Sequence, residues 1–90
     1  MNLSENFKKR LIHATGCDTL EVVIKTVLNS YIITFTVEIS GIAYKRDLKL
    51  WTYEVATSKL NYDKVLVQQA CSFYNRAQEV DELREKETYI

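Results

Sequence analysis

Apolar and polar residues alternate most regularly over residues 31–40, where every odd-numbered side chain is apolar. Because successive strand residues point to opposite faces, this pattern predicts a strand with one buried face. Ser40 and Gly41 end the run and suit a two-residue hairpin turn, since glycine readily adopts positive φ. A return strand is expected over residues 42–55, with Arg46 interrupting its apolar face.

Helical periodicity is clearest towards the two ends of the chain. Residues 3–15 predict a helix that Asn2 caps, and Gly16 suits the left-handed position after its end. The longest element is a helix expected over residues 61–86, where apolar side chains recur at steps of three and four. The apolar stripe of this helix consists of Tyr62, Leu66, Ala70, Phe73, Ala77 and Val80.

Residues 18–29 fit two elements. As a helix, they have Asp18 as the cap and a continuous apolar stripe from which only Val22 is left out. As a strand, they are rich in β-branched residues and would pair with residues 31–39 across an Asn29-Ser30 turn. In that pairing Val22 would lie opposite Val37. The helix is preferred because the cap and the stripe agree.

Together these elements predict an α+β fold. The preferred order is two short N-terminal helices, an antiparallel β-hairpin and a long C-terminal amphipathic helix. The alternative is α-β-β-β-α with a three-stranded antiparallel meander, whose order alone is similar to that of double-stranded-RNA-binding domains. Residues 59–64 lack the dense lysine cluster with which such domains grip phosphates. Ninety residues fit one small domain, residues 1–90, whose acidic end over residues 79–90 is expected to fray.

Composition excludes several classes of protein. Twelve basic residues balance twelve acidic ones, and 47% of the residues are hydrophobic, so neither a polycationic nor a disordered chain is expected. Two cysteines and one histidine cannot form a disulfide framework or a four-thiolate zinc site. His13 and Cys17 stand four apart, but no orienting third group accompanies them. We therefore expect no catalytic residue, no metal and no cofactor, and no enzyme.

The N-terminal residues lack the apolar run of a signal peptide, and no apolar stretch is long enough to span a membrane. A cytoplasmic location with reduced thiols is therefore expected, without membrane contact.

Basic and aromatic residues are interleaved along the expected return strand. A tryptophan beside lysines is a frequent anchor of protein interfaces. The predicted partner-binding residues, expected on one strand face outside the core, are Lys45, Lys49, Trp51 and Tyr53. A second predicted surface lies on the long helix, where small side chains would let a second copy approach closely. These self-association residues are Ala70, Phe73 and Ala77, and zero net charge also favours a homodimer.

The expected function is that of a small non-enzymatic module that binds a protein partner. The lack of proline and the frequent use of isoleucine, lysine, asparagine and tyrosine suit a phage or mobile-element protein. We accordingly expect an inhibitor or adaptor acting on a host enzyme or immune complex. The alternative is a nucleic-acid-binding regulator that uses the basic-aromatic hairpin surface. The charge supports this alternative only weakly, because residues 44–64 have a net charge of only +2.

Overall fold

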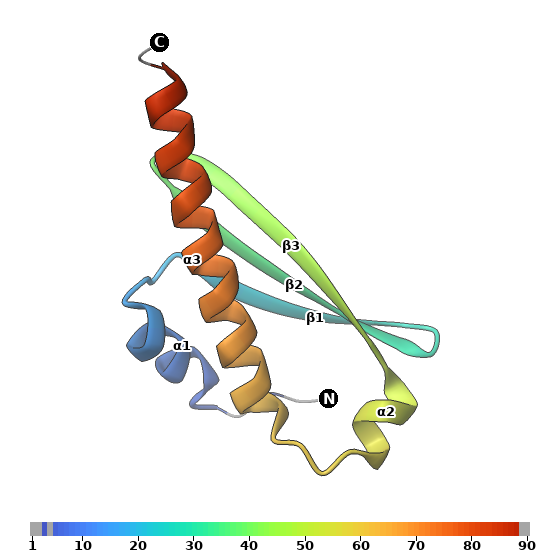
Figure 1. Ribbon diagram of the computed structural model, residues 1–90. Helices are drawn as coiled ribbons and strands as arrows, with labels where there is room; N and C mark the ends of the chain where they lie inside the picture. The colour runs from blue at the N-terminus through green and yellow to red at the C-terminus, as the bar shows by residue number, and fades with distance from the viewer. Residues whose placement is uncertain (1–2, 4, 89–90) are drawn as a thin grey trace.

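The computed structural model describes residue 3 and residues 5–88, with side chains up to Arg84. Its elements are α1 (Phe7–Thr15), β1 (Glu21–Val27), β2 (Ser30–Ile39), β3 (Ile42–Trp51), α2 (Thr52–Thr57) and α3 (Tyr62–Thr88). The three strands form one antiparallel sheet in the order β1-β2-β3 (Figure 1). The predicted α+β class with a long C-terminal helix is confirmed.

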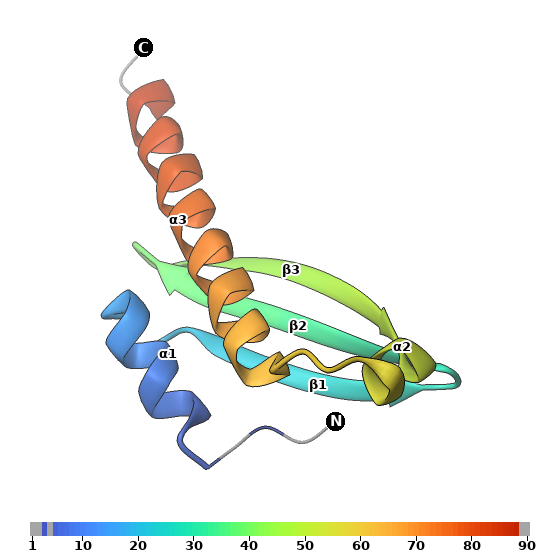
Figure 2. The same cartoon turned by 60° about the horizontal axis from the view of Figure 1, so that its bottom comes forward.

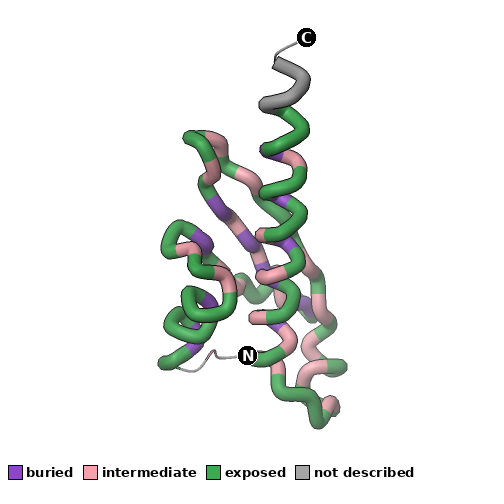
Figure 3. Tube along the Cα trace, turned by 60° about the vertical axis from the view of Figure 1, so that its left-hand side comes forward, coloured by how far each residue is buried: buried purple, intermediate pink, exposed green. Residues whose placement is uncertain are grey.

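Two layers make up the molecule. α1 and α3 lie on one face of the sheet, and no helix of the described residues covers the other face (Figure 2). The buried residues lie where the helices and the sheet face each other (Figure 3). They come from α1, from the segment before β1, from the odd-numbered positions of β2 and from the stripe of α3. The core consists of Phe7, Leu11, Leu20, Ile33, Phe35, Val37, Leu66, Ala70, Phe73 and Ala77.

The helix expected over residues 18–29 is wrong, because residues 21–27 form β1. Val22, which the helical stripe leaves out, packs against the core. Val23 and Val27, which the stripe would bury, are exposed on the uncovered face of the sheet. Pairing with β2 gives the β-branched run a ladder of backbone hydrogen bonds, which outweighs the favourable cap at Asp18.

The β1–β2 hairpin also has a different register from the one expected for the strand alternative. Val22 lies opposite Phe35, and Val27 opposite Ser30, so the two turn residues are Leu28 and Asn29. The shift is by two residues, and it therefore keeps the same side chains on the core face. At the other end of β2, Ser40 and Gly41 both have positive φ, at 53° and 77°, which confirms the predicted turn.

β3 is shorter than the expected return strand and ends at Trp51 rather than near Val55. Trp51 pairs with Ser30, the first residue of β2. Beyond this pair β2 has no further strand residue. Thr52 still bonds to Asn29 in the turn, and residues 52–57 form α2. Tyr53 consequently belongs to a helix and not to the strand face predicted for it.

The ends of the helices also differ from expectation. α1 begins at Phe7, after Asn6, and not at residue 3; the expected cap Asn2 lies outside the described residues. Gly16 has the expected left-handed conformation, with φ 69°. α3 continues as a helix to Thr88, and the fraying expected over residues 79–90 stays a prediction. Tyr89 and Ile90 lie outside the described residues.

A buried carboxylate connects α3 to the sheet beyond the apolar core. Asp81 is only 6% exposed, and it accepts hydrogen bonds from Ser40 Oγ at 3.1 Å and Tyr44 Oη at 2.8 Å. These bonds tie the β2–β3 turn to α3. Partial burial raises the pKa of Tyr44, and the hydrogen bond to Asp81 raises it further. Within the described residues, no helix is both long and apolar enough to cross a membrane.

Candidate functional site

The β1–β2 turn and the end of β3 meet at one end of the sheet, beside α2 (Figure 2). The carbonyl oxygen of Asn29 accepts hydrogen bonds from the backbone N–H of Thr52 at 2.8 Å and from its Oγ1 at 3.0 Å. These two bonds extend the β2–β3 ladder by one pair. They hold the turn against the start of α2 and give this end of the sheet a fixed shape.

A shallow depression of about 270 Å³ opens on this end of the sheet. We call the residues that line it the tip surface; they are Val27, Leu28, Asn29, Ser30, Ile32, Lys49 and Trp51. Leu28 is 93% exposed and Trp51 45% exposed. Leu28 and much of Trp51 therefore remain in contact with water, although a monomer gains nothing from exposing them.

The tryptophan of the tip surface is held by its neighbour. Lys49 Nζ lies 4.5 Å from the centroid of the Trp51 ring, a cation–π arrangement. Both side chains point to the uncovered face, because they stand two residues apart on β3. The indole is thus ordered in advance, which reduces the entropy that a binding event would cost.

The backbone of the tip surface is strained at one residue. Leu28 has φ 53°, in the left-handed region that leucine rarely adopts. A turn made for stability alone would carry glycine or asparagine at this position. Exposure of a large apolar side chain adds a second unfavourable feature at the same residue. Such strain clusters at functional sites, where it is retained for what the side chain does.

The strain makes a measurable prediction. Leu28→Gly should raise the free energy of unfolding by about 0.5–1 kcal/mol, because glycine adopts positive φ without a steric penalty. Urea unfolding followed by circular dichroism measures the change. The matched control is Leu60→Gly at another exposed leucine, whose φ is not positive; it should give no gain. Equal effects of the two substitutions would show that Leu28 is unstrained.

The predicted partner-binding residues are only partly brought together. Lys45, Lys49 and Trp51 lie on the uncovered face, opposite Thr36, Ile32 and Ser30 of β2. Lys45 stands outside the tip surface, four residues from Lys49. Tyr53 is exposed on α2. That these four residues bind a partner stays a prediction.

The predicted self-association residues lie inside the molecule. Ala70, Phe73 and Ala77 are all buried, and the Phe73 ring lies 6.0 Å from that of Phe35, measured between centroids. The small side chains let α3 approach the sheet of its own chain. A second copy could reach them only if α3 left the sheet, so they are not carried further as a dimer surface.

Sequence reasoning missed Leu28, Val27 and Ile32 of the tip surface. The expected helix over residues 18–29 places Val27 and Leu28 on its apolar stripe. The signal that favours the hairpin is the β-branched run that ends at Val27, close before the alternating residues 31–40.

No group of three potential metal ligands occurs among the described residues. Cys17 and Cys71 are half-buried free thiols, and Cys17 Sγ lies 3.2 Å from Thr19 Oγ1. Comparison of the chain with protein-family models, curated proteins and solved structures finds no match.

Proposed function

We propose that this chain is a small non-enzymatic interaction module that binds a protein partner through the tip surface. The observation that carries the proposal is Leu28, a strained and almost fully exposed leucine beside a preordered tryptophan. Tryptophan is enriched among the few residues that supply most of the binding energy of an interface, and the exposed Leu28 beside Trp51 adds apolar area that a partner can bury.

A protein partner fits the tip surface better than a nucleic acid does. Lys49 is the one charged residue among those that line it, and its ammonium covers a face of the Trp51 ring on which a base would stack. Over the whole uncovered face, the basic Lys25, Lys45 and Lys49 are balanced by Glu21, Glu38 and Asp47. A phosphate backbone would meet no net positive field there.

A module of this kind acts by occupying or bridging surfaces of its partner, as an inhibitor or an adaptor does. The composition suits a phage or mobile-element protein that acts on a host enzyme or immune complex, and this remains part of the proposal.

The experiment compares variants of the tagged chain in capture from a lysate, with and without nuclease. Trp51→Ala should weaken binding of the captured protein about tenfold, because the side chain lost is the main apolar anchor. Leu28→Gly should weaken it as well while stabilising the fold, a combination that a damaged structure would not produce. Capture should survive nuclease.

The matched controls are Leu83→Ala and Leu60→Gly, which alter exposed apolar residues away from the tip surface. Both should bind as the original chain does. Loss of all captured species on nuclease treatment would favour the nucleic-acid alternative. Full binding by Trp51→Ala and Leu28→Gly would remove the tip surface as the site.

A further inference from the structure

β3 is one of the two edge strands of the sheet, and among the described residues its hydrogen-bonded neighbour is β2. The Thr52 N–H pairs with Asn29 across this ladder, and bonded positions alternate along an antiparallel strand. The even-numbered residues of β3 therefore direct their N–H and C=O groups to β2. The odd-numbered residues from Ala43 to Trp51 direct theirs away from the sheet, where the described chain supplies no strand.

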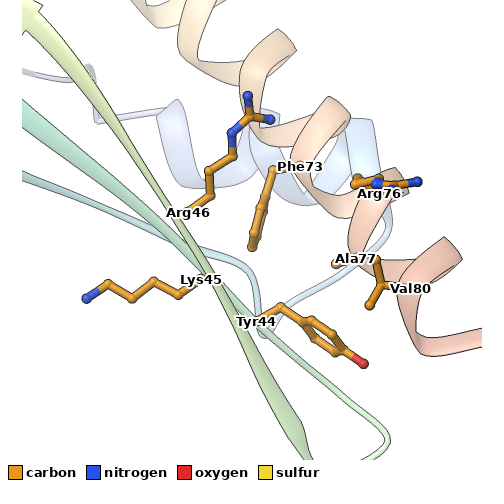
Figure 4. A pocket seen from close by; sticks show the side chains of 7 residues that line it. All are labelled: Tyr44, Lys45, Arg46, Phe73, Arg76, Ala77 and Val80. Carbon is orange, nitrogen blue, oxygen red and sulfur yellow. The ribbon is translucent and has the colours of Figure 1, made fainter. Parts of the chain in front are cut away.

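A groove of about 210 Å³ runs between this open edge and α3 (Figure 4). Its floor and helix side are largely apolar, and two arginines line it. The groove is lined by Tyr44, Lys45, Arg46, Phe73, Arg76, Ala77 and Val80. The side chain of Lys45 points away from α3 in Figure 4, whereas those of Tyr44 and Arg46 lie on the α3 side.

The charge on the edge selects one kind of partner. Arg46 is the basic residue that β3 directs to the groove side, because Lys45, Asp47 and Lys49 lie on the uncovered face of the sheet. On α3, Arg76 is already paired with Glu79 at 3.0 Å. Among the described residues Arg46 has neither a hydrogen-bond nor an ion-pair partner. Its guanidinium lies beside Phe73 on the helix side of β3, where it can bind a carboxylate with two parallel hydrogen bonds (Figure 4).

We propose that an extended acidic segment of a partner protein adds to β3 as a fourth strand and fills this groove. The odd-numbered residues of β3 pair with its backbone, and the side chains that face the groove supply selectivity. A carboxylate lies opposite Arg46. An apolar side chain lies opposite Tyr44 and contacts Ala77 and Val80.

The register follows from the parity of the ladder. Tyr44 and Arg46 bond to β2, so on the other edge they occupy non-hydrogen-bonded positions, where opposing side chains come closest. They are two residues apart, and so are the partner residues that face them. The segment therefore has an acidic residue and an apolar residue separated by one position, whichever direction the strand runs. Proline cannot stand where the segment donates to β3.

A library of short random peptides displayed on a carrier tests this inference on the full chain. Selection should enrich peptides with an acidic and an apolar residue two positions apart. A labelled copy of an enriched peptide should bind the purified chain and slow amide exchange at Ala43, Lys45 and Asp47. Arg46→Glu should weaken its binding about tenfold or more. Arg46→Gln provides a second variant without reversed charge.

Arg10→Glu on exposed α1 is the matched control and should leave peptide binding unchanged. Trp51→Ala should also leave it unchanged, which separates this groove from the tip surface. Circular dichroism verifies that each variant is folded. The inference is overturned if no acidic motif is enriched, if Arg46→Glu binds the peptide normally, or if the β3 amides gain no protection. Pairing of β3 with a second copy, seen by sedimentation and by the same exchange signals without peptide, would also overturn it.

Discussion

Phe35→Ala should lower the free energy of unfolding by about 3–5 kcal/mol, the largest change expected for any single substitution in the core. The Phe35 side chain is 1% exposed at the centre of β2, and its ring contacts that of Phe73 on α3. Alanine would remove the main contact between the two layers and leave a cavity. A chain of this length has a total stability of about 5–13 kcal/mol, so the variant would retain little of it.

Urea unfolding followed by circular dichroism measures this loss. Phe35→Leu keeps most of the side-chain volume and should lower the free energy of unfolding by less. This variant can still be measured if the alanine variant does not fold. The control Tyr53→Ala removes an exposed aromatic ring from α2 and should change stability by no more than about 0.5 kcal/mol. A loss below about 1 kcal/mol for Phe35→Ala would mean that α3 does not enclose this face of the sheet.

Asp81→Ala should cost about 2–3 kcal/mol, the second largest effect. The substitution removes the acceptor of two hydroxyl groups and leaves Tyr44 Oη half-buried without that bond. Asp81→Asn should cost less, since its amide oxygen still accepts one hydrogen bond. Glu82→Ala, at the exposed neighbouring position, is the control and should be close to neutral. Equal stabilities of the Asp81 and Glu82 variants would show that the β2–β3 turn is not fastened to α3.

The pH dependence of the stability provides a second test of the contact between Tyr44 and Asp81. Because the folded state raises the pKa of Tyr44 above its ordinary value of 10.0, the protonated phenol stabilises the fold. This contribution is fully present below pH 10 and is lost as the pH rises through the raised pKa. The hydrogen bond to Asp81 is one cause of the shift, so in Asp81→Ala the alkaline loss attributable to Tyr44 should be smaller.

The fold class could be predicted because its strongest signals are local. The alternation over residues 31–40, the turn at Ser40-Gly41 and the stripe of α3 each reflect one side-chain period, and the structure has all three. Residues 18–29 carry both periods at once. Which one prevails depends on whether β2 has a free edge beside them, and this is a tertiary fact that no local pattern contains.

The candidate site could be predicted only in part for a related reason. Lys49 and Trp51 follow from alternation along one strand. Leu28 lies beside these two residues because of the β1–β2 register, which no local pattern in the sequence specifies. Tyr53 lies apart from them because β2 ends opposite Trp51. Arg46 is a residue whose role could not be predicted. In the sequence it only interrupts the apolar face of a strand, and the structure shows that it lines a groove beside α3.

The order of the strands also determines which loop closures cost conformational entropy when the chain folds. Each strand follows its neighbour through a two-residue turn, so both hairpins close short loops at little entropic cost. α1 packs against α3, and all three strands lie between these two helices in the sequence (Figure 1). The longest loop closure among the described elements is therefore the docking of α1 against α3, and the packing of α3 on the sheet closes a shorter one, whereas the sheet itself forms from contacts between neighbours along the chain.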